Sequence, residues 1–430
     1  MTKKSQRFLN ITKYSFLNLG AIITRVTIKR VLIFILTLVV VGTIATLVSF
    51  YARGYRLDPN ELRVNPNGLL VVKSVPDGAS IVINGELKTA TDATIPLPPG
   101  IYDLIVRKEG YIPWNKRIEL DKEVVTQITV HLFKSVPSLS AVTFSGSINP
   151  QPSYDLTKIA FVVPLNLPNS AILEESSGLW VIEAVNLPIG FARDPRRITN
   201  GDLTSASYTW SPDSREILLT TGVGNFLLDA GEFTPQPQLV NLSSSRIDEI
   251  LADWKFDREK KLRSKMNRLP EDFIDILERR TSSLLFSPDE DMILYTASSA
   301  ATIPTDLIKQ LPGSSTQEQE RNIKKGRSYI YDIKEDRNFL IYTEPVVLGG
   351  EEQNGLDRRL TWFSTSRHLV LAEPEKITIM DYDGTNRHEV YTGSYVSPHA
   401  FPTLSTDRLL ILTNLGASEA LPNLYSLSLK

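Results

Sequence analysis

Residues 208–222 read YTWSPDSREILLTTG, and residues 284–298 read LLFSPDEDMILYTAS. Each stretch places an aromatic residue before Ser-Pro-Asp, which is followed by two or three polar residues and an apolar run of four or five. Ser-Pro-Asp favours a tight turn, because proline fixes φ and the aspartate side chain bonds back to the backbone. Each stretch therefore predicts a strand, a tight turn and an antiparallel strand.

The same unit recurs in weaker form across residues 139–430. Its second strands start near Ile159, Ile217, Ile293, Leu369 and Leu409. Repeats of four short strands with a period of about 40–45 residues are typical of a β-propeller. We therefore predict a propeller of about five blades, with six as the alternative. Residues 139–144 precede the first copy, and we expect them to pair with the final blade and protect the sheet edges.

Two insertions interrupt the repeat. Residues 245–280 are charged and have helical periodicity, and Pro270 divides them into two predicted helices. These helices could cap one face or dock a partner, and the plainer alternative is that they pack on the side of the propeller. Residues 298–325 are rich in Ser, Gln and charge, so we expect a mobile surface loop.

One copy of the repeat has a more specific ending. Residues 377–393 read ITIMDYDGTNRHEVYTG, which resembles the end of the TolB-type propeller repeat. The resemblance implies a propeller of that type, in which the other copies are degenerate.

Residues 69–133 form a second β-rich region, which we call the β-module. Short alternating strands are divided by glycines at expected turns, namely Gly78, Gly85, Gly100 and Gly110. Asn84-Gly85 is a strong hairpin signal. The content and the turn spacing predict a small all-β sandwich.

Three motifs of the β-module resemble the PEGA domain family. They are PDGA at 76–79, PLPPGIY at 96–102 and VRKEGY at 106–111, with Asp77 in place of the family's Glu. The resemblance implies a non-catalytic module of envelope and surface-layer proteins, which acts as a spacer or a binding unit. Tyr111, Trp114 and Tyr102 are candidates for an aromatic sugar or peptide platform, and the alternative is that they lie in the core.

Residues 31–50 read VLIFILTLVVVGTIATLVSF and contain no charge. About 20 apolar residues in a helix span the hydrocarbon core of a bilayer. We predict a transmembrane helix at 31–51, between a basic tail at 1–30 and a linker at 52–68. Part of the tail, residues 8–28, is either an amphipathic helix on the membrane surface or loosely ordered.

The charges on either side of this helix predict its orientation. Residues 1–57 hold nine basic residues and no acidic one. Basic flanks stay in the cytoplasm, so we expect a single-pass signal anchor with the C-terminal domains outside the membrane. The rest of the chain holds 38 basic against 49 acidic residues, a net charge of −11 that disfavours nucleic-acid binding. The absence of cysteine excludes disulfides and thiolate chemistry.

No motif in the sequence assigns a catalytic, cofactor-binding or metal-binding residue. The histidines, His131, His368, His388 and His399, lack metal-ligand spacing. Asp381, Asp383 and Asn386 weakly mimic a calcium loop but lack its final Glu, so a hairpin turn explains them better. Gly222-Val223-Gly224 is half of a dinucleotide fingerprint and is interpreted as a turn.

The sequence favours a non-enzymatic, membrane-anchored binding or scaffold protein of a prokaryotic cell envelope. The residues Val31 to Phe50 would contact lipid, and the propeller would bind a protein or a cell-wall polymer at residues that the sequence does not identify. One alternative is an anchored hydrolase or lyase with its site in the propeller channel. Another is a partner of a membrane assembly, recognised through the cytoplasmic tail.

Overall fold

The computed structural model describes residues 3–52, 55–57, 64–165, 176–184, 194–309, 315–350, 355–418 and 420–430. Within these ranges, residues 3–27, 55–57 and 64–66 are described by their backbone alone. Contacts divide the chain into two compact units. Unit 1 comprises residues 1–71, 94–100 and 120–127, and unit 2 comprises residues 72–93, 101–119 and 128–430.

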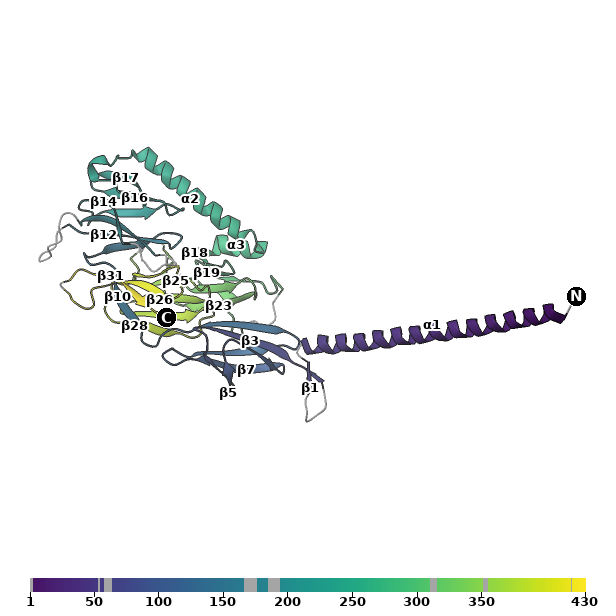
Figure 1. Cartoon of the computed structure of the whole chain (residues 1–430). Helices are drawn as coiled ribbons and strands as arrows, with labels where there is room; N and C mark the ends of the chain where they lie inside the picture. Colours follow the sequence, from purple (N-terminus) through teal and green to yellow (C-terminus); the bar gives the residue numbers. More distant parts are fainter. Residues whose placement is uncertain are drawn as a thin grey trace. The chain divides into compact units, whose positions relative to one another are not determined.

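Unit 1 begins with helix α1, Lys3–Ala52 (Figure 1). Its segment Ile28–Ala52 has a mean hydropathy of 2.9 and is long and apolar enough to cross a membrane. The hydroxyls of Thr37, Thr43 and Thr46 each donate to the backbone carbonyl four residues earlier, at 2.8 Å. The threonine donors are thus satisfied within the helix, as a lipid environment requires.

The β-module contains the two sheets of the expected sandwich. One has the order β6-β3-β9 and the other the order β5-β4-β7-β8. Their strands are β3 (Gly68–Val75), β4 (Ser80–Ile83), β5 (Glu86–Ala90), β6 (Ala93–Leu97), β7 (Gly100–Arg107), β8 (Trp114–Leu120) and β9 (Val125–His131). Before them, β1 (Tyr55–Leu57) pairs with β2 (Val64–Pro66). Residues 53–54 and 58–63 of the expected linker lie outside the described residues.

The rest of unit 2 contains five sheets in sequence order, which are the blades of the predicted propeller, and their strands pair antiparallel except for β24 with β25. A further two-stranded sheet, β20 (Ala301–Thr302) with β21 (Asn322–Ile323), lies within the loop that was expected to be mobile. Blade 1 is β11 (Ile148–Pro152), β12 (Lys158–Val163), β13 (Gly178–Glu183) and β14 (Arg196–Asn200), and blade 2 is β15 (Ser207–Trp210), β16 (Glu216–Thr221) and β17 (Gly224–Asp229). Blade 3 is β18 (Thr281–Phe286), β19 (Met292–Ala297), β22 (Ser328–Asp332) and β23 (Arg337–Tyr342). Blade 4 is β25 (Arg359–Trp362), β26 (His368–Glu373), β27 (Lys376–Asp381) and β28 (His388–Thr392), extended by β24 (Val347–Leu348). Blade 5 is β29 (Ala400–Pro402), β30 (Arg408–Thr413) and β31 (Asn423–Ser428).

A strand from the beginning of the propeller completes the last blade. Strand β10, Ser138–Ala141, pairs with β31 in the register Leu139 to Leu427 and Ala141 to Tyr425. The expected pairing with the final blade is therefore confirmed for residues 139–141, and residues 142–144 lie beyond the strand. The pairing joins the two ends of the repeat and covers an edge of β31 that would otherwise be open.

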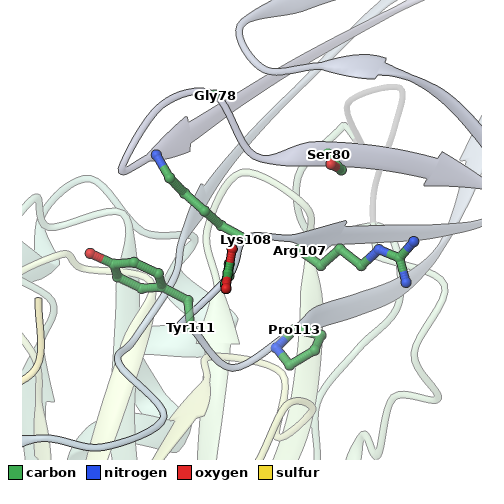
Figure 2. A pocket seen from close by; sticks show the side chains of 8 residues that line it. Gly78, Ser80, Arg107, Lys108, Tyr111 and Pro113 are labelled. Carbon is green, nitrogen blue, oxygen red and sulfur yellow. The ribbon is translucent and has the colours of Figure 1, made fainter.

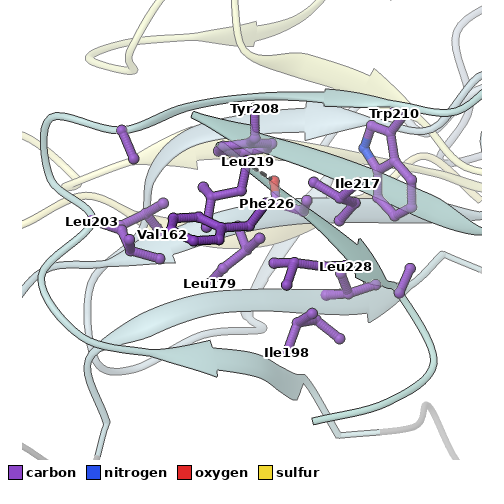
Figure 3. Close-up of a cluster of buried hydrophobic side chains, with 14 residues drawn as sticks. Val162, Leu179, Ile198, Leu203, Tyr208, Trp210, Ile217, Leu219, Phe226 and Leu228 are labelled. Carbon is purple, nitrogen blue, oxygen red and sulfur yellow. Dashed lines mark hydrogen bonds between the residues drawn. The ribbon is translucent and has the colours of Figure 1, made fainter. Parts of the chain in front are cut away.

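Alternating side chains of each blade face its two neighbours. Ile217 and Leu219 of β16 pack toward blade 1 in the cluster drawn in Figure 3, where they meet Val162 and Leu179. Similar clusters join blade 1 to blade 5, blade 3 to blade 4 and blade 4 to blade 5. Because successive side chains of a strand point to opposite faces of the sheet, each strand provides apolar side chains to both packing faces of its blade.

The helical insertion lies between blades 2 and 3. Helix α2, Ser244–Met266, buries Ile250 and Trp254 against Leu218, whose neighbours in β16 face the other way. Helix α3, Glu271–Arg280, buries Phe273 and Leu277 in the core of blade 3. Figure 1 shows α2 extending from blade 2 to α3 and β18. At the junction of blades 2 and 3, the helices thus pack on the apolar faces that a neighbouring blade covers elsewhere.

Buried serines hold the Ser-Pro-Asp turns. The Ser211 hydroxyl donates to Asp213 at 2.7 Å and accepts from the backbone N–H of Glu216 at 2.9 Å. Ser287 repeats this pattern with Asp289 and with the N–H of Met292. The motif therefore forms tight turns because one buried hydroxyl satisfies both the side chain and the returning strand.

Candidate functional site

The antiparallel order of the strands gives the propeller two distinct faces. The turn face carries the loops from first to second and from third to fourth strands, including the Ser-Pro-Asp turns. The mouth face lies where the first strands begin and carries the loops from second to third strands. Each face is therefore a separate candidate site.

Helix α2 occupies part of the turn face. Lys261 donates to the carbonyl of Pro212 in the turn of blade 2 at 3.0 Å. Arg258 bonds to the Tyr154 hydroxyl in the turn of blade 1, and Lys265 pairs with Glu290 in the turn of blade 3 at 3.1 Å. The charges of the insertion thus contact the turns of three blades.

Strand β8 of the β-module contacts another part of the turn face, also within unit 2. The Trp114 indole N–H donates to Asp381 at 2.9 Å, and Lys116 Nζ lies 2.7 Å from Asp383 Oδ2. Asn386 donates to Asp381 at 3.0 Å and to the carbonyl of Asn115 at 3.0 Å. We call this buried group of side chains the latch. The loop that weakly mimicked a calcium site is therefore a turn whose carboxylates hold β8.

The latch buries both charges of its ion pair. The Asp383 side chain is fully buried, and the Lys116 side chain is 14% exposed. Burial opposes the Lys116 charge, but Asp383 and Asp381 outweigh it, so the pKa of the ammonium is raised. Burial raises the pKa of Asp381 to about 6 despite the nearby Lys116. The Lys116 ammonium thus stabilises the charged form of Asp383 more strongly than the charged form of Asp381.

The loop expected to be mobile also reaches this region. Ser315 donates to Asp383 at 2.8 Å, and Thr316 donates to the carbonyl of Arg117 at 2.7 Å. Residues 310–314 lie outside the described residues, and the mobility of 298–325 stays a prediction.

Two of the four histidines lie together next to the latch. The rings of His131 and His368 have centroids 5.7 Å apart, and His368 Nε2 lies 3.5 Å from Asp381. Burial lowers the pKa of His368 to about 3, and His131 and Lys116 add to the effect. Within the described ranges, no group of three His, Cys, Asp or Glu side chains could hold a metal ion.

The mouth face has a pocket of about 170 Å³ at the start of the central channel. It is lined by the first strand of blade 1 and by the beginnings of the first strands in blades 2, 4 and 5, through Asn149, Pro150, Gln151, Pro152, Ala206, Ser207, Tyr208, Gly350, Arg359 and His399. The pocket therefore lies at the end of the channel opposite to the Ser-Pro-Asp turns.

Arg359 is the permanent cation among the described residues that line the pocket. Arg359 is buried, donates to the carbonyl of Gly349 at 2.8 Å and lies over the Phe401 ring. Burial and the Arg359 charge lower the pKa of His399 to about 4, so its ring is neutral at neutral pH. Burial also raises the pKa of Tyr208, whose hydroxyl donates to backbone carbonyls. Among the described lining residues there is no carboxylate.

Large apolar side chains stand exposed around the mouth face. Phe144, between β10 and β11, and Val223, between β16 and β17, are both 82% exposed. Leu415, between β30 and β31, is 56% exposed.

The β-module has a second cleft, of about 410 Å³ (Figure 2). The PDGA and VRKEGY segments meet there, and Tyr111 is among the lining residues. Trp114 is buried and bonded to Asp381, so it is not available for the aromatic platform considered from the sequence. Tyr102 is half-buried and lies outside the cleft lining.

Sequence reasoning missed several residues of these sites. It did not identify Arg359, His399 or Gln151 at the mouth, or Lys116 in the latch. A basic residue in an otherwise apolar first strand, as at Arg359, is one signal that could have been followed. Lys116 sits in an alternating strand, where a charge on one face is ordinary, so no local signal marks it.

Comparisons with known proteins agree with the two β-rich regions. Residues 67–135 match the family model of the PEGA domain. No curated protein sequence matches the chain.

Three solved structures are similar to the chain at low identity. A putative TolB from Agrobacterium tumefaciens is 11% identical, with 65% of this chain and 77% of that chain covered and a TM-score of 0.21. TolB from Acinetobacter baumannii is 12% identical, with 76% and 59% covered and a TM-score of 0.19. A luciferin-regenerating enzyme is 10% identical, with 68% and 95% covered and a TM-score of 0.26. TM-scores this low do not establish a shared fold, so the assignment of a propeller rests on the five sheets of the chain itself. The chain carries a PEGA domain at residues 67–135, and a five-bladed β-propeller follows it.

Proposed function

We propose that this chain is a membrane-anchored, extracytoplasmic binding or scaffold protein, and that the mouth face of its propeller is the binding platform. The observation that carries the proposal is the contrast between the two faces. The turn face is engaged by α2 and by β8, whereas the mouth face has a pocket and exposes Phe144, Val223 and Leu415. Docked apolar residues would gain free energy by leaving water.

Several features support the anchored part of the proposal. The segment Ile28–Ala52 is apolar and uncharged after Arg30, and all of its side chains are exposed. Seven basic residues and no acidic one precede residue 31. A single apolar helix with a basic N-terminal flank favours an anchor whose N-terminus stays in the cytoplasm. Anchoring would raise the local concentration of the platform at the membrane surface.

Binding accounts for the pocket better than catalysis does. Hydrolases and lyases need a base or a nucleophile placed against the substrate. Of the ionisable groups that line the described pocket, Arg359 is a permanent cation, Tyr208 is tied to carbonyl oxygens and His399 is a weak base. A polar pocket without a base or nucleophile placed among its described lining residues favours recognition of a protein or polymer partner.

A photo-crosslinking amino acid placed at Val223 tests the proposal in living cells. We expect a discrete, identifiable adduct with one envelope component. The same amino acid at Leu404, which is 47% exposed on the turn face, is the control and should give none. Adducts of equal yield at both positions would refute the mouth face as the platform. Turnover of a wall polymer by the purified protein, lost in His399→Gln, would favour the enzyme instead.

A further inference from the structure

The cleft of the β-module is built by segments that are separate in the sequence. Gly78 and Ser80 contribute one side, at the loop between β3 and β4 and the start of β4. Arg107, at the end of β7, and the turn that follows it contribute the other side, down to Pro113. Ser80 and Arg107 are direct partners in the ladder between β4 and β7, which fixes the two sides together.

The lining of the cleft is polar and aromatic. It consists of Gly78, Ser80, Arg107, Lys108, Glu109, Gly110, Tyr111 and Pro113. Pro113 is the one lining residue with an aliphatic side chain, so the cleft has no apolar slot that would hold an acyl chain. Gly78 adopts φ of +68° and leaves open space beside Lys108, because a Cβ there would meet only the Lys108 ammonium, at 3.9 Å.

The charges of the cleft are not neutralised by ion pairs. Within the described residues, Arg107, Lys108 and Glu109 form no salt bridge, and Lys108 donates to the backbone carbonyl of Asp77, a neutral acceptor. Figure 2 shows Arg107 extending toward one end of the cleft, with Lys108 and Tyr111 extending toward the other. An elongated ligand would therefore meet a cation at each end.

The combination of groups indicates the chemistry of such a ligand. Guanidinium and ammonium groups bind carboxylate or phosphate oxygens, and an aromatic face packs against the C–H face of a sugar ring. The Ser80 hydroxyl and the Glu109 carboxylate can bond to sugar hydroxyls. These partners together match an acidic saccharide and do not match an acyl chain.

We propose that this cleft binds a short segment of an acidic polysaccharide, with Arg107 and Lys108 pairing with its acidic groups and Tyr111 packing on a sugar ring. The site is separate from the mouth face of the propeller. Only its access to an envelope polymer rests on the proposed extracytoplasmic location of the chain. The β-module would then bind an envelope polymer while the propeller binds its own partner.

Calorimetric titration of the full chain in detergent micelles with a galacturonic acid trimer tests the proposal. We expect binding that weakens at high salt, because the cations are exposed. Arg107→Gln should weaken it about tenfold, since a hydrogen bond to a charged group is lost. Tyr111→Ala should also weaken it, whereas Tyr111→Phe should bind as the native chain does. Lys73→Gln, an exposed cation on β3 outside the cleft, is the matched control and should have no effect.

Three outcomes of the saccharide titrations would overturn the proposal. They are no binding of the trimer at millimolar concentration, equal binding of the uncharged galactose trimer, and an unchanged affinity in Arg107→Gln. Phosphatidylglycerol vesicles that bind in an Arg107-dependent manner while the trimer does not would also overturn it, in favour of a lipid headgroup. Melting temperatures equal to that of the native chain would show that the variants are folded. Crosslinking at Val223 and trimer binding at Arg107 can fail separately, so the two proposals are distinguishable.

Discussion

Replacing Lys116 by Met should destabilise unit 2 strongly, because it removes the cation of the latch. Asp383 Oδ2 lies 2.7 Å from Lys116 Nζ and is fully buried, so the variant leaves an uncompensated carboxylate that water does not reach. Removing one partner of a buried ion pair costs about 3–5 kcal/mol. In a domain of this size, that loss lowers the melting temperature by roughly 5–10 °C.

Arg117→Met is the matched control for this prediction. Arg117 is the next residue in β8 and pairs with Asp103 at 2.8 Å, but its side chain is 65% exposed. An exposed pair contributes about 0–1 kcal/mol, so this variant should melt close to the native chain. The double variant Lys116→Met with Asp383→Asn should recover part of the loss, because residue 383 no longer carries a buried charge that needs the ammonium.

The assay is thermal unfolding of the full chain in detergent, followed by far-ultraviolet circular dichroism. Tryptophan fluorescence provides a second signal, since Trp114 donates to Asp381 within the latch. Equal melting temperatures for Lys116→Met and Arg117→Met would refute the reasoning. A double variant as unstable as the sum of its single variants would show that Lys116 and Asp383 act independently.

Three further predictions concern the helical insertion, the Ser-Pro-Asp turns and the stability of the fold in acid. Trp254→Ala should cost about 3–5 kcal/mol in chemical unfolding, because the side chain is 7% exposed between α2 and blade 2, whereas Phe256→Ala, 64% exposed on the same helix, should cost little. Ser287→Ala should cost about 1–3 kcal/mol, because the buried N–H of Met292 loses its acceptor, and equal stability would contradict the role given to this hydroxyl. Burial lowers the pKa of His368 to about 3 from its ordinary 6.5, so the unfolded chain binds more protons between these values and stability is lost as pH falls through that window. His368→Gln should therefore flatten the loss of stability on acidification. Asp381 has the opposite effect on the pH dependence of stability, because its pKa is raised to about 6 and the folded chain binds more protons between about pH 4 and 6. Asp381→Asn should therefore steepen the loss of stability on acidification. Equal slopes of stability against pH in the two variants would contradict both assignments.

The blades could be predicted from the sequence because their signals are local. A Ser-Pro-Asp turn, an aromatic residue before it and an apolar strand after it lie within about 15 residues, and a turn residue acts on its immediate neighbours. Each expected second strand is present, and Ile217 starts its run one residue inside β16. The spare strand before the first blade could also be predicted, because the last copy of the repeat ends about one strand short while residues 139–144 belong to no other copy.

The contacts between distant segments could not be predicted in the same way. Trp114 and Asp381 are separated by 267 residues, and neither residue has a local pattern that names the other. An aromatic residue after a turn is equally compatible with a sugar platform, with the core and with a hydrogen bond to a buried carboxylate. The pocket at the mouth also depends on blades 1, 2, 4 and 5 together, so it exists only once the ring is formed.

The position of the helical insertion was left open for a related reason. Helical periodicity shows which side chains of α2 face the protein, but not which surface they meet. Leu218 provides that surface, on the face of β16 opposite to the one that packs against blade 1. The sequence did not predict this contact, because the stretch after β17 carries no clear strand pattern that would place the helices.

Cysteine labelling in intact cells tests the central claim, an anchored chain whose propeller faces outward, most directly. The native chain has no cysteine, so single substitutions at Ser5 and at the exposed Val223 report without background. A membrane-impermeant maleimide should label Val223→Cys in intact cells and Ser5→Cys only after lysis. Labelling of Ser5→Cys in intact cells, with Val223→Cys protected until lysis, would contradict the account.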